Sequence, residues 1–334
     1  MAIKERYIYR LVDHAGNIVE PVMAGLSGGV LNANVDATIR WAGTVDSERP
    51  IWFDPWRYRV QVVHVSGVGL ETKRVIGTFH VRPKSWETGK ARHVETWNLY
   101  DLSIHVSEDE NSTIWTETKG SNVADRIEWI IRQIGLNISI TDSAATLRRE
   151  MVWEETESKL TIVNGLAQAG GFFALHTNPF GQFQLAPYRE PQSRPVVYRF
   201  ATAPDAIHTA DVEGEHAQVV PNKVIAHARG DGDNPDLVSI AVDYADVNAT
   251  GVYRSRTYDV EAASQAVLDA HAKRLLATAR NTSRTVTRYM LQAPLALNDV
   301  VSDVTGARYV VETIDMDIKP GALMRVGLRE IREG

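Results

Sequence analysis

A short glycine-rich segment near the N-terminus has the spacing of a serine nucleophile. Residues Gly25-Leu26-Ser27-Gly28-Gly29 match the G-x-S-x-G pattern. In that pattern a sharp turn from a strand to a helix lifts the serine hydroxyl above a parallel sheet. Here an alternating strand pattern follows the segment, and no helical pattern does. The sequence therefore predicts a flexible glycine turn and argues against a serine hydrolase.

Three carboxylates beside a tryptophan are the second candidate for chemistry. Glu154, Glu155 and Glu157 adjoin Trp153, and a carboxyl group in an apolar pocket can act as a general acid. A glycosidase also needs a second carboxylate at a defined separation. The same glutamates precede a predicted helix, whose dipole favours negative charge at its start. We expect the dipole role and no catalysis.

An oxygen-rich loop, GDGDNPD from Gly230 to Asp236, resembles a calcium-binding loop. It lacks the bidentate glutamate that completes an EF-hand loop. Gly, Asp, Asn and Pro are also the commonest turn-forming residues. The sequence therefore predicts a polar turn here and leaves open whether an ion binds at Asp231–Asp236.

Tryptophan and histidine residues give no further catalytic signature. Trp115, Trp129 and Trp153 could be taken for a stacking platform, but packing in a core is the usual role of a large aromatic side chain. The ten histidines form no H-x-x-x-H or H-E-x-x-H motif, and no G-x-x-x-x-G-K-[ST] phosphate-binding motif occurs. We therefore predict no catalytic residue, no cofactor and no metal site.

The composition is that of a soluble globular protein with more than one domain. The chain has 334 residues, 44% of them hydrophobic and 23% charged, and this length fits two or three domains. The formal net charge of −6 argues against a dedicated nucleic-acid binder, which normally carries a basic excess. Because the chain has no cysteine, disulfides, thiolate nucleophiles and zinc–thiolate sites are excluded.

No targeting or membrane segment is evident in the sequence. No stretch approaches the roughly 18 consecutive apolar residues of a transmembrane helix. The start, MAIKERYIYRLVDHAG, lacks the basic-then-apolar layout of a signal peptide. We expect no membrane insertion by this chain, and synthesis and assembly in the cytoplasm.

Residues 1–108 are predicted to form an N-terminal β-barrel domain. From Leu31 to Trp41 apolar and polar residues alternate completely, which is the period of a half-buried strand. Similar runs at Tyr58–Val65, Arg74–Val81 and His93–Ile104 are separated by turn residues. Several short strands at this spacing indicate a barrel or a sandwich.

The pattern changes in residues 109–190, which we predict to be an α+β domain. Apolar residues recur at helical spacing from Val123 to Ile134, with Ser121 as the expected N-cap. A second helix is predicted from Ser158 to Ala169, ending at two glycines. A hairpin follows, with type I turn residues at Asn178–Gly181.

Residues 191–334 are predicted to form a C-terminal β-barrel domain with one helix at about 260–279. Two strands are clear, Arg308–Ile318 and Leu323–Ile331, joined by Lys319-Pro320-Gly321. The fold class is therefore mainly β with an α+β insertion, in which two small β-barrel domains flank an α+β domain.

A resemblance to a known family rests on the order and spacing of these segments. Residues 151–188, MVWEETESKLTIVNGLAQAGGFFALHTNPFGQFQLAPY, resemble the middle domain of minor tail proteins from phages of actinobacteria. Arg194-Pro195-Val196, Val220–Val224 and Tyr253–Thr257 are also similar to that family. Three consecutive segments resemble the closing barrel strands of tail-hub proteins: Asn298–Val301, Ala307–Ile318 and Gly321–Leu328.

The resemblance implies a structural baseplate-hub protein of a siphophage tail tip. It implies two related β-barrels and a homotrimer around the tail axis, in a pseudo-sixfold ring that meets the hexameric tail. It also implies contacts with other tail proteins (distal tail protein, tape measure, fibre or spike proteins), and DNA only passing through the channel. The location would be the virion tail tip, after assembly in the host bacterial cytoplasm. Asp231, Asp233 and Asp236 are candidates for the channel wall.

Two other classes of protein stay open at this stage. A phage cell-wall-degrading glycosidase would use the cluster Glu154–Glu157. A carbohydrate-binding receptor module would stack sugars on Trp52, Trp56 and Trp86. Many larger relatives of the family continue into a peptidase, a lysozyme or a fibre-like extension, whereas this chain stops at Gly334 directly after its last predicted strand. We therefore expect no enzyme.

Overall fold

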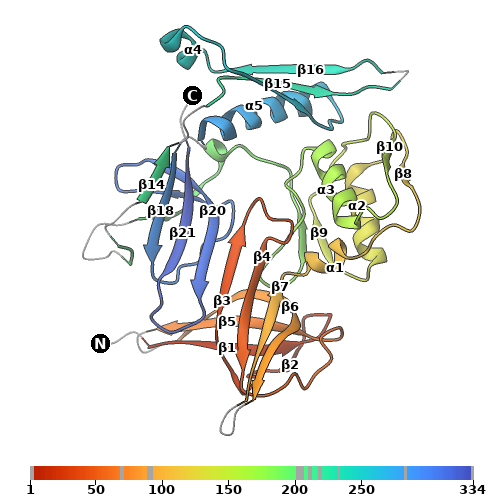
Figure 1. The fold of residues 1–334 in the computed structure, drawn as a ribbon. Coiled ribbons are helices and arrows are strands. Elements are labelled where there is room, and N and C mark those ends of the chain that lie inside the picture. Colours follow the sequence, from red (N-terminus) through yellow and green to blue (C-terminus); the bar gives the residue numbers. More distant parts are fainter. Residues whose placement is uncertain are drawn as a thin grey trace.

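The fold is built from four parts that enclose a central region (Figure 1). The computed structural model describes residues 4–67, 71–88, 93–200, 207–209, 213–216, 220–231, 234–281 and 284–331. N-terminal strands lie at the bottom of the view and C-terminal strands at the left. A helical module lies at the right, and a layer of sheet and helix lies across the top. No helix in these described ranges is long and apolar enough to cross a membrane.

The N-terminal part is made of seven strands. They are β1 (Lys4–Val12), β2 (Ile18–Glu20), β3 (Leu26–Asn34), β4 (Trp41–Ser47), β5 (Arg59–Gly67), β6 (Thr72–Thr88) and β7 (His93–Tyr100). The predicted strands at Tyr58–Val65 and Arg74–Val81 correspond to β5 and to part of β6.

The single strand predicted from Leu31 to Trp41 is wrong. The chain reverses between β3 and β4, and Asn34 starts the turn: its side-chain oxygen accepts a 2.8 Å hydrogen bond from the Asp36 N–H. Asparagine side chains stabilise turns in this way. The alternation therefore continues through a turn, and Leu31 and Ala33 are buried whereas Ala37 is exposed.

The strand predicted from His93 to Ile104 is also too long. β7 ends at Tyr100, and the helix α1 (Ser103–Ser107) follows. Asp101 redirects the chain, because its carboxylate accepts hydrogen bonds from the Ser103 N–H and from the Trp41 N–H, each at 2.8 Å.

The C-terminal strands join the same sheet as the N-terminal strands. They are β13 (Val196–Arg199), β14 (Glu213–His216), β18 (Arg284–Met290), β19 (Val300–Ser302), β20 (Arg308–Asp317) and β21 (Met324–Ile331). β20 pairs antiparallel with β3, so Ile314 lies opposite Ala33. Among the described strands the order runs from β14 to β2 in one open, thirteen-stranded sheet and does not close into two separate barrels.

One hydrophobic core serves both groups of strands. It contains Val45 and Trp97 from the N-terminal strands and Val311 and Val326 from the C-terminal strands, all fully buried. The mainly β fold with an α+β insertion is confirmed. The domain boundaries at residues 108 and 190 stay a prediction. Because the two β parts share one core, the folding of each is expected to depend on the other.

The α+β module has its own core. Its elements after α1 are β8 (Trp115–Glu117), α2 (Val123–Gln133), β9 (Ile138–Ile140), β10 (Met151–Trp153), α3 (Lys159–Gly170), β11 (His176–Thr177) and β12 (Phe183–Leu185). Helices α2 and α3 bury their apolar faces against each other, with Ile127 and Leu166 fully buried. The N-cap of α2 is Asn122 and not Ser121, because the Asn122 side chain accepts from the Asp125 N–H.

The signals at α3 and the hairpin are confirmed. The Ser158 hydroxyl caps the first turn of α3, and Gly171 ends the helix in the left-handed conformation, with φ +73°. In the hairpin the Gly181 N–H donates to the Asn178 carbonyl at 2.9 Å, as the turn residues predict.

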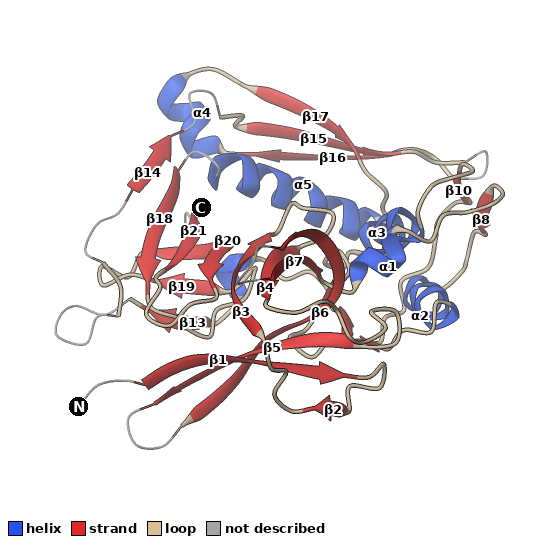
Figure 2. Cartoon of the chain, turned by 60° about the horizontal axis from the view of Figure 1, so that its bottom comes forward, coloured by secondary structure: helices blue, strands red, loops and turns tan. Residues whose placement is uncertain are grey.

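The top layer is formed by β15 (Lys223–Ala228), β16 (Leu237–Val242), α4 (Tyr244–Thr250), β17 (Ser255–Asp259) and α5 (Gln265–Asn281) (Figure 2). The short helix η1 (Pro191–Ser193) is hydrogen-bonded to β20 instead, where Arg308 donates to the Gln192 carbonyl at 3.0 Å. The three strands form a sheet of their own in the order β16-β15-β17, with α5 packed on one face. Helix α5 begins later than the predicted residue 260, and the Ser264 carbonyl accepts from the Leu268 N–H in its first turn.

Candidate functional site

The segment around Ser27 lies inside strand β3. A bulge shifts the register between β3 and β4 at Ser27 to Val30, and Gly28 and Gly29 have positive φ values of +58° and +126°. A Cβ atom on Gly29 would lie 2.2 Å from the Thr44 carbonyl oxygen. The glycines therefore allow a bulged, close approach of two strands. No strand-to-helix elbow forms around Ser27.

The glutamates beside Trp153 do not form an acid–base site. Glu154 and Glu155 are exposed, so neither carboxylate lies in the apolar pocket that a buried general acid needs. The expected dipole role is not supported either. Helix α3 begins at Lys159, and its first turn contains no acidic residue. Ser158 provides the N-terminal cap instead.

The oxygen-rich loop is held by its own hydrogen bonds. The Asp231 carboxylate accepts from the Asn234 N–H at 2.8 Å and lies 3.3 Å from the Lys119 ammonium. The Asp236 carboxylate accepts from a backbone N–H of the same loop at 2.8 Å. Asp233 lies outside the described residues. In the described part of the chain no group of three His, Asp or Glu residues could hold a metal ion, and a channel-wall role stays a prediction.

The two sets of tryptophans lie in different surroundings. Trp52 is covered by the Arg49 guanidinium, 3.7 Å from its ring centre, and Trp56 packs against His80 at 5.0 Å. Trp86 is 70% exposed.

In the α+β module Trp153 has the expected core position, and Trp115 is partly buried against the same core. Trp153 is 8% exposed, whereas Trp129 is 42% exposed. Trp115 packs against Trp129 with ring centres 5.9 Å apart.

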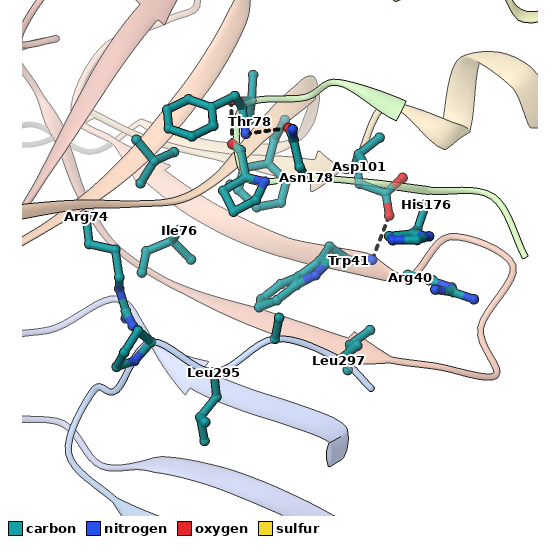
Figure 3. Close-up of a pocket in the computed structure, with 18 of the residues that line it drawn as sticks. Arg40, Trp41, Arg74, Ile76, Thr78, Asp101, His176, Asn178, Leu295 and Leu297 are labelled. Carbon is teal, nitrogen blue, oxygen red and sulfur yellow. Dashed lines mark hydrogen bonds between the residues drawn. The ribbon is translucent and has the colours of Figure 1, made fainter. Parts of the chain in front are cut away.

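A cavity of about 810 Å³ lies where three parts of the chain meet, and we call it the junction groove (Figure 3). Its walls come from β6, from the β11–β12 hairpin, and from residues 292–299. Much of the lining is apolar. The apolar lining residues include Trp41, Ile76, Phe180, Leu295 and Leu297.

Charged groups lie at both ends of the junction groove. Arg40 lies near His176 at one end and Arg74 at the other (Figure 3). Burial lowers the pKa of both arginines and of His176 from their ordinary values. Burial also raises the pKa of Asp101, against the effect of its hydrogen bonds. A groove of this kind, with apolar walls and few convergent polar groups, is typical of a binding site.

No sequence motif predicted this groove. Its walls come from segments more than 200 positions apart in the chain, and none of them carries a binding motif. The only usable signal was the hairpin turn at Asn178–Gly181, whose tip forms part of the wall.

The top layer exposes an apolar sheet face. Ile225 and Ile240 lie opposite each other in the β15–β16 pair, on the face away from α5. Val238 and Ile240 are 47% and 55% exposed. Contiguous exposed apolar surface of this kind marks interaction sites.

Comparison with solved structures gives the class of this fold: it is the fold of phage and prophage tail proteins. A tail protein from Neisseria meningitidis matches with a TM-score of 0.69 at 14% identity, over 97% of each chain. The 43 kDa tail protein of prophage MuSo2 from Shewanella oneidensis matches with a TM-score of 0.63 at 11% identity, over 97% of this chain and 98% of that one.

A secretion-system protein has a related fold. It is an Escherichia coli type VI secretion component that itself shows structural similarity to the T4 bacteriophage tail proteins gp27 and gp5. It matches with a TM-score of 0.52 at 7% identity, over all of this chain and 77% of that one. No protein-family model and no curated protein matches the sequence. The tail-hub-like fold expected from the resemblance is therefore confirmed at the level of fold.

Proposed function

We propose that this chain is a structural hub protein of a phage tail tip. Three copies form a ring around the tail channel and join the tail tube to tip or fibre proteins. The ring contacts the distal tail protein, the tape measure, and fibre or spike proteins, and DNA only passes through its channel. Its place is the virion tail tip, after assembly in the host bacterial cytoplasm.

One observation carries the proposal. The fold matches a tail protein over 97% of both chains with a TM-score of 0.69, so all four parts of the molecule take part in the likeness. A fold alone does not define a function, but the matched proteins are tail proteins and a secretion component with T4-tail similarity.

The exposed surfaces support a role in assembly. Besides the outer face of the β15–β16 pair, the edge strand β2 exposes Ile18 and Val19 at about half of their surface, 51% and 50%. An uncovered edge strand with apolar side chains is a template for pairing with another chain. Such surfaces are expected in a subunit that is covered by neighbours.

The proposal includes the absence of enzymatic activity on the cell wall, and this can be tested directly. Purified chain incubated with peptidoglycan should release no soluble fragments, because Glu154 and Glu155 lie in solvent and not in an apolar pocket. Glu154→Gln and Glu155→Gln should leave assembly unchanged. Fragment release by the wild-type chain that either substitution abolishes would favour the glycosidase instead. Binding to glycans that is lost in Trp86→Ala would favour the carbohydrate-binding module.

A further inference from the structure

Part of the β6 edge that lines the junction groove is not paired with any described strand. β6 pairs with β5 through Thr72–Phe79 and with β7 through His80–Thr88, and the sheet order β7-β6-β5 places these two neighbours on opposite edges. β7 ends at Tyr100, opposite His80. In the described ranges no strand therefore covers the β7-side edge of β6 between Thr72 and Gly77. Unpaired backbone groups on such an edge accept an added strand.

Two cations in the groove form no close ion pair with any carboxylate of the described residues. Arg40 and Arg74 are half-buried, and Asp101 and Asp36 attract Arg40 electrostatically without a hydrogen bond to it. The carboxylates in the groove wall have other partners. Asp101 accepts from Trp41 and Ser103, and Asp299 accepts from the backbone N–H of Ala296 at 2.8 Å. A partly desolvated charge without a hydrogen-bonded counter-ion is costly, so these guanidinium groups favour an anionic ligand that can bind them directly.

The apolar walls set the rest of the ligand's chemistry. Ile76, on β6, faces Leu295 and Leu297 across the groove (Figure 3). The volume of about 810 Å³ lies within the range of roughly 300–1,000 Å³ that ligand sites show. Apolar walls of this kind fit aliphatic side chains and offer little to a hydrated phosphate backbone.

We propose that the junction groove binds an extended, apolar segment of another polypeptide that carries Asp or Glu, added as a strand to the free edge of β6. Backbone hydrogen bonds to Thr72–Gly77 supply affinity. Carboxylates of the segment pair with Arg74 and Arg40, and its aliphatic side chains lie between Ile76 and Leu297. The site goes beyond the hub ring and does not depend on it, since a monomeric chain would present the same groove.

Peptide binding to the full chain tests this site. The probe is a fluorescent, end-capped peptide about eight residues long, with Glu near each end and Val between, so that it spans the free edge and matches the charged ends and apolar middle of the groove. It should bind with an affinity that Arg40→Gln plus Arg74→Gln weakens about tenfold or more. Arg57→Gln, an exposed arginine outside the groove lining, is the matched control and should have no effect.

Two peptide analogues distinguish strand addition from nonspecific binding. Replacing Glu by Lys should abolish binding, and N-methylation of alternate backbone amides should weaken it, because the methyl groups remove the ladder donors. Absence of binding up to about 1 mM peptide, equal binding of the Lys peptide, or equal binding of the N-methylated peptide would each overturn the proposal.

Hydrogen exchange locates the binding site of the peptide and tests whether a second copy of this chain occupies the groove instead. Peptide should slow amide exchange within Thr72–Gly77 and leave β21 unchanged. If the same amides become protected as the concentration of the chain alone rises, the occupant is a second copy of this chain, and the proposal of a different partner is wrong.

Discussion

Two adjacent glycines at the bulge of β3 should differ in how much stability is lost when each is replaced by alanine. Gly29→Ala should cost more than about 3 kcal/mol, because φ is +126° and the new Cβ would meet the Thr44 carbonyl oxygen at 2.2 Å. Gly28→Ala should cost only about 1–2 kcal/mol, because its φ of +58° is left-handed but the space is open. Urea unfolding measures both. Equal costs would show that β3 and β4 do not approach closely at Gly29.

Two histidines between the N-terminal strands and α1 make stability depend on pH. The rings of His80 and His105 are 4.5 Å apart, and the Nε2 atom of each is buried with no hydrogen-bond partner in the described part of the chain. Burial and the nearby Arg59 lower the pKa of His80 to about 4 and that of His105 to about 3. Both rings are therefore neutral in the folded chain at pH 6.

The unfolded chain binds these protons near pH 6.5, so it takes up more protons than the folded chain as the pH falls. Stability should therefore be complete above pH 6.5 and decrease toward pH 4. Between pH 7 and pH 5 the free energy of unfolding should decrease in both proteins. In the double variant His80→Gln, His105→Gln this decrease should be smaller than in the wild type by about 1 kcal/mol, after allowance for solvent screening. Denaturant unfolding at the two pH values measures this. His227→Gln, on the separate sheet of the top layer, is the control, and an unchanged pH dependence in the double variant would contradict the assignment.

At the scale of elements, the pairing of β20 with β3 couples the two ends of the chain. Asp315 lies opposite Asn32 on one side and Arg325 on the other. Asp315→Pro removes a ladder N–H in the middle of the sheet and should cost about 3 kcal/mol or more. Amide exchange should then speed up in β4 as well as in β21, because both belong to one sheet and one core.

Asp315→Ala is the matched control for that substitution, because it removes the side chain but keeps the backbone N–H. Exchange that speeds up only in the C-terminal strands would show that residues 1–108 fold independently. That result would support the barrel domain predicted from the sequence.

Local signals were enough to predict some elements. The Ser158 cap, the glycines at the end of α3 and the turn at Asn178–Gly181 act within a few residues of the chain, and each forms as predicted. The same is true of β20, whose burial alternates from Thr313 to Asp317.

Other features depend on contacts that the sequence pattern does not contain. The period of two continued through the Asn34 turn, so two strands looked like one. The β3–β20 pairing joins residues about 280 positions apart, and the junction groove collects its walls from three distant segments. The candidate residues chosen for their chemistry, such as Ser27 and Glu154, lie outside the lining of that groove.

At the scale of the whole molecule, the N-terminal and C-terminal strands share one sheet, and the described part of the chain leaves apolar surfaces exposed. The N-terminal and C-terminal strands present two sheet ends, β2 and β14, and the top layer presents the face around Ile240. Identical subunits usually satisfy such surfaces by closing into a ring with cyclic symmetry. The proposed trimer would cover them in this way.

The mass of the purified chain in solution tests the central claim most directly. Native mass spectrometry over a range of protein concentrations should show a species with three times the mass of the 37.1 kDa chain, because the proposed hub closes as a ring of three copies. A chain that stays monomeric at every concentration, or a ring of six copies, would contradict the account.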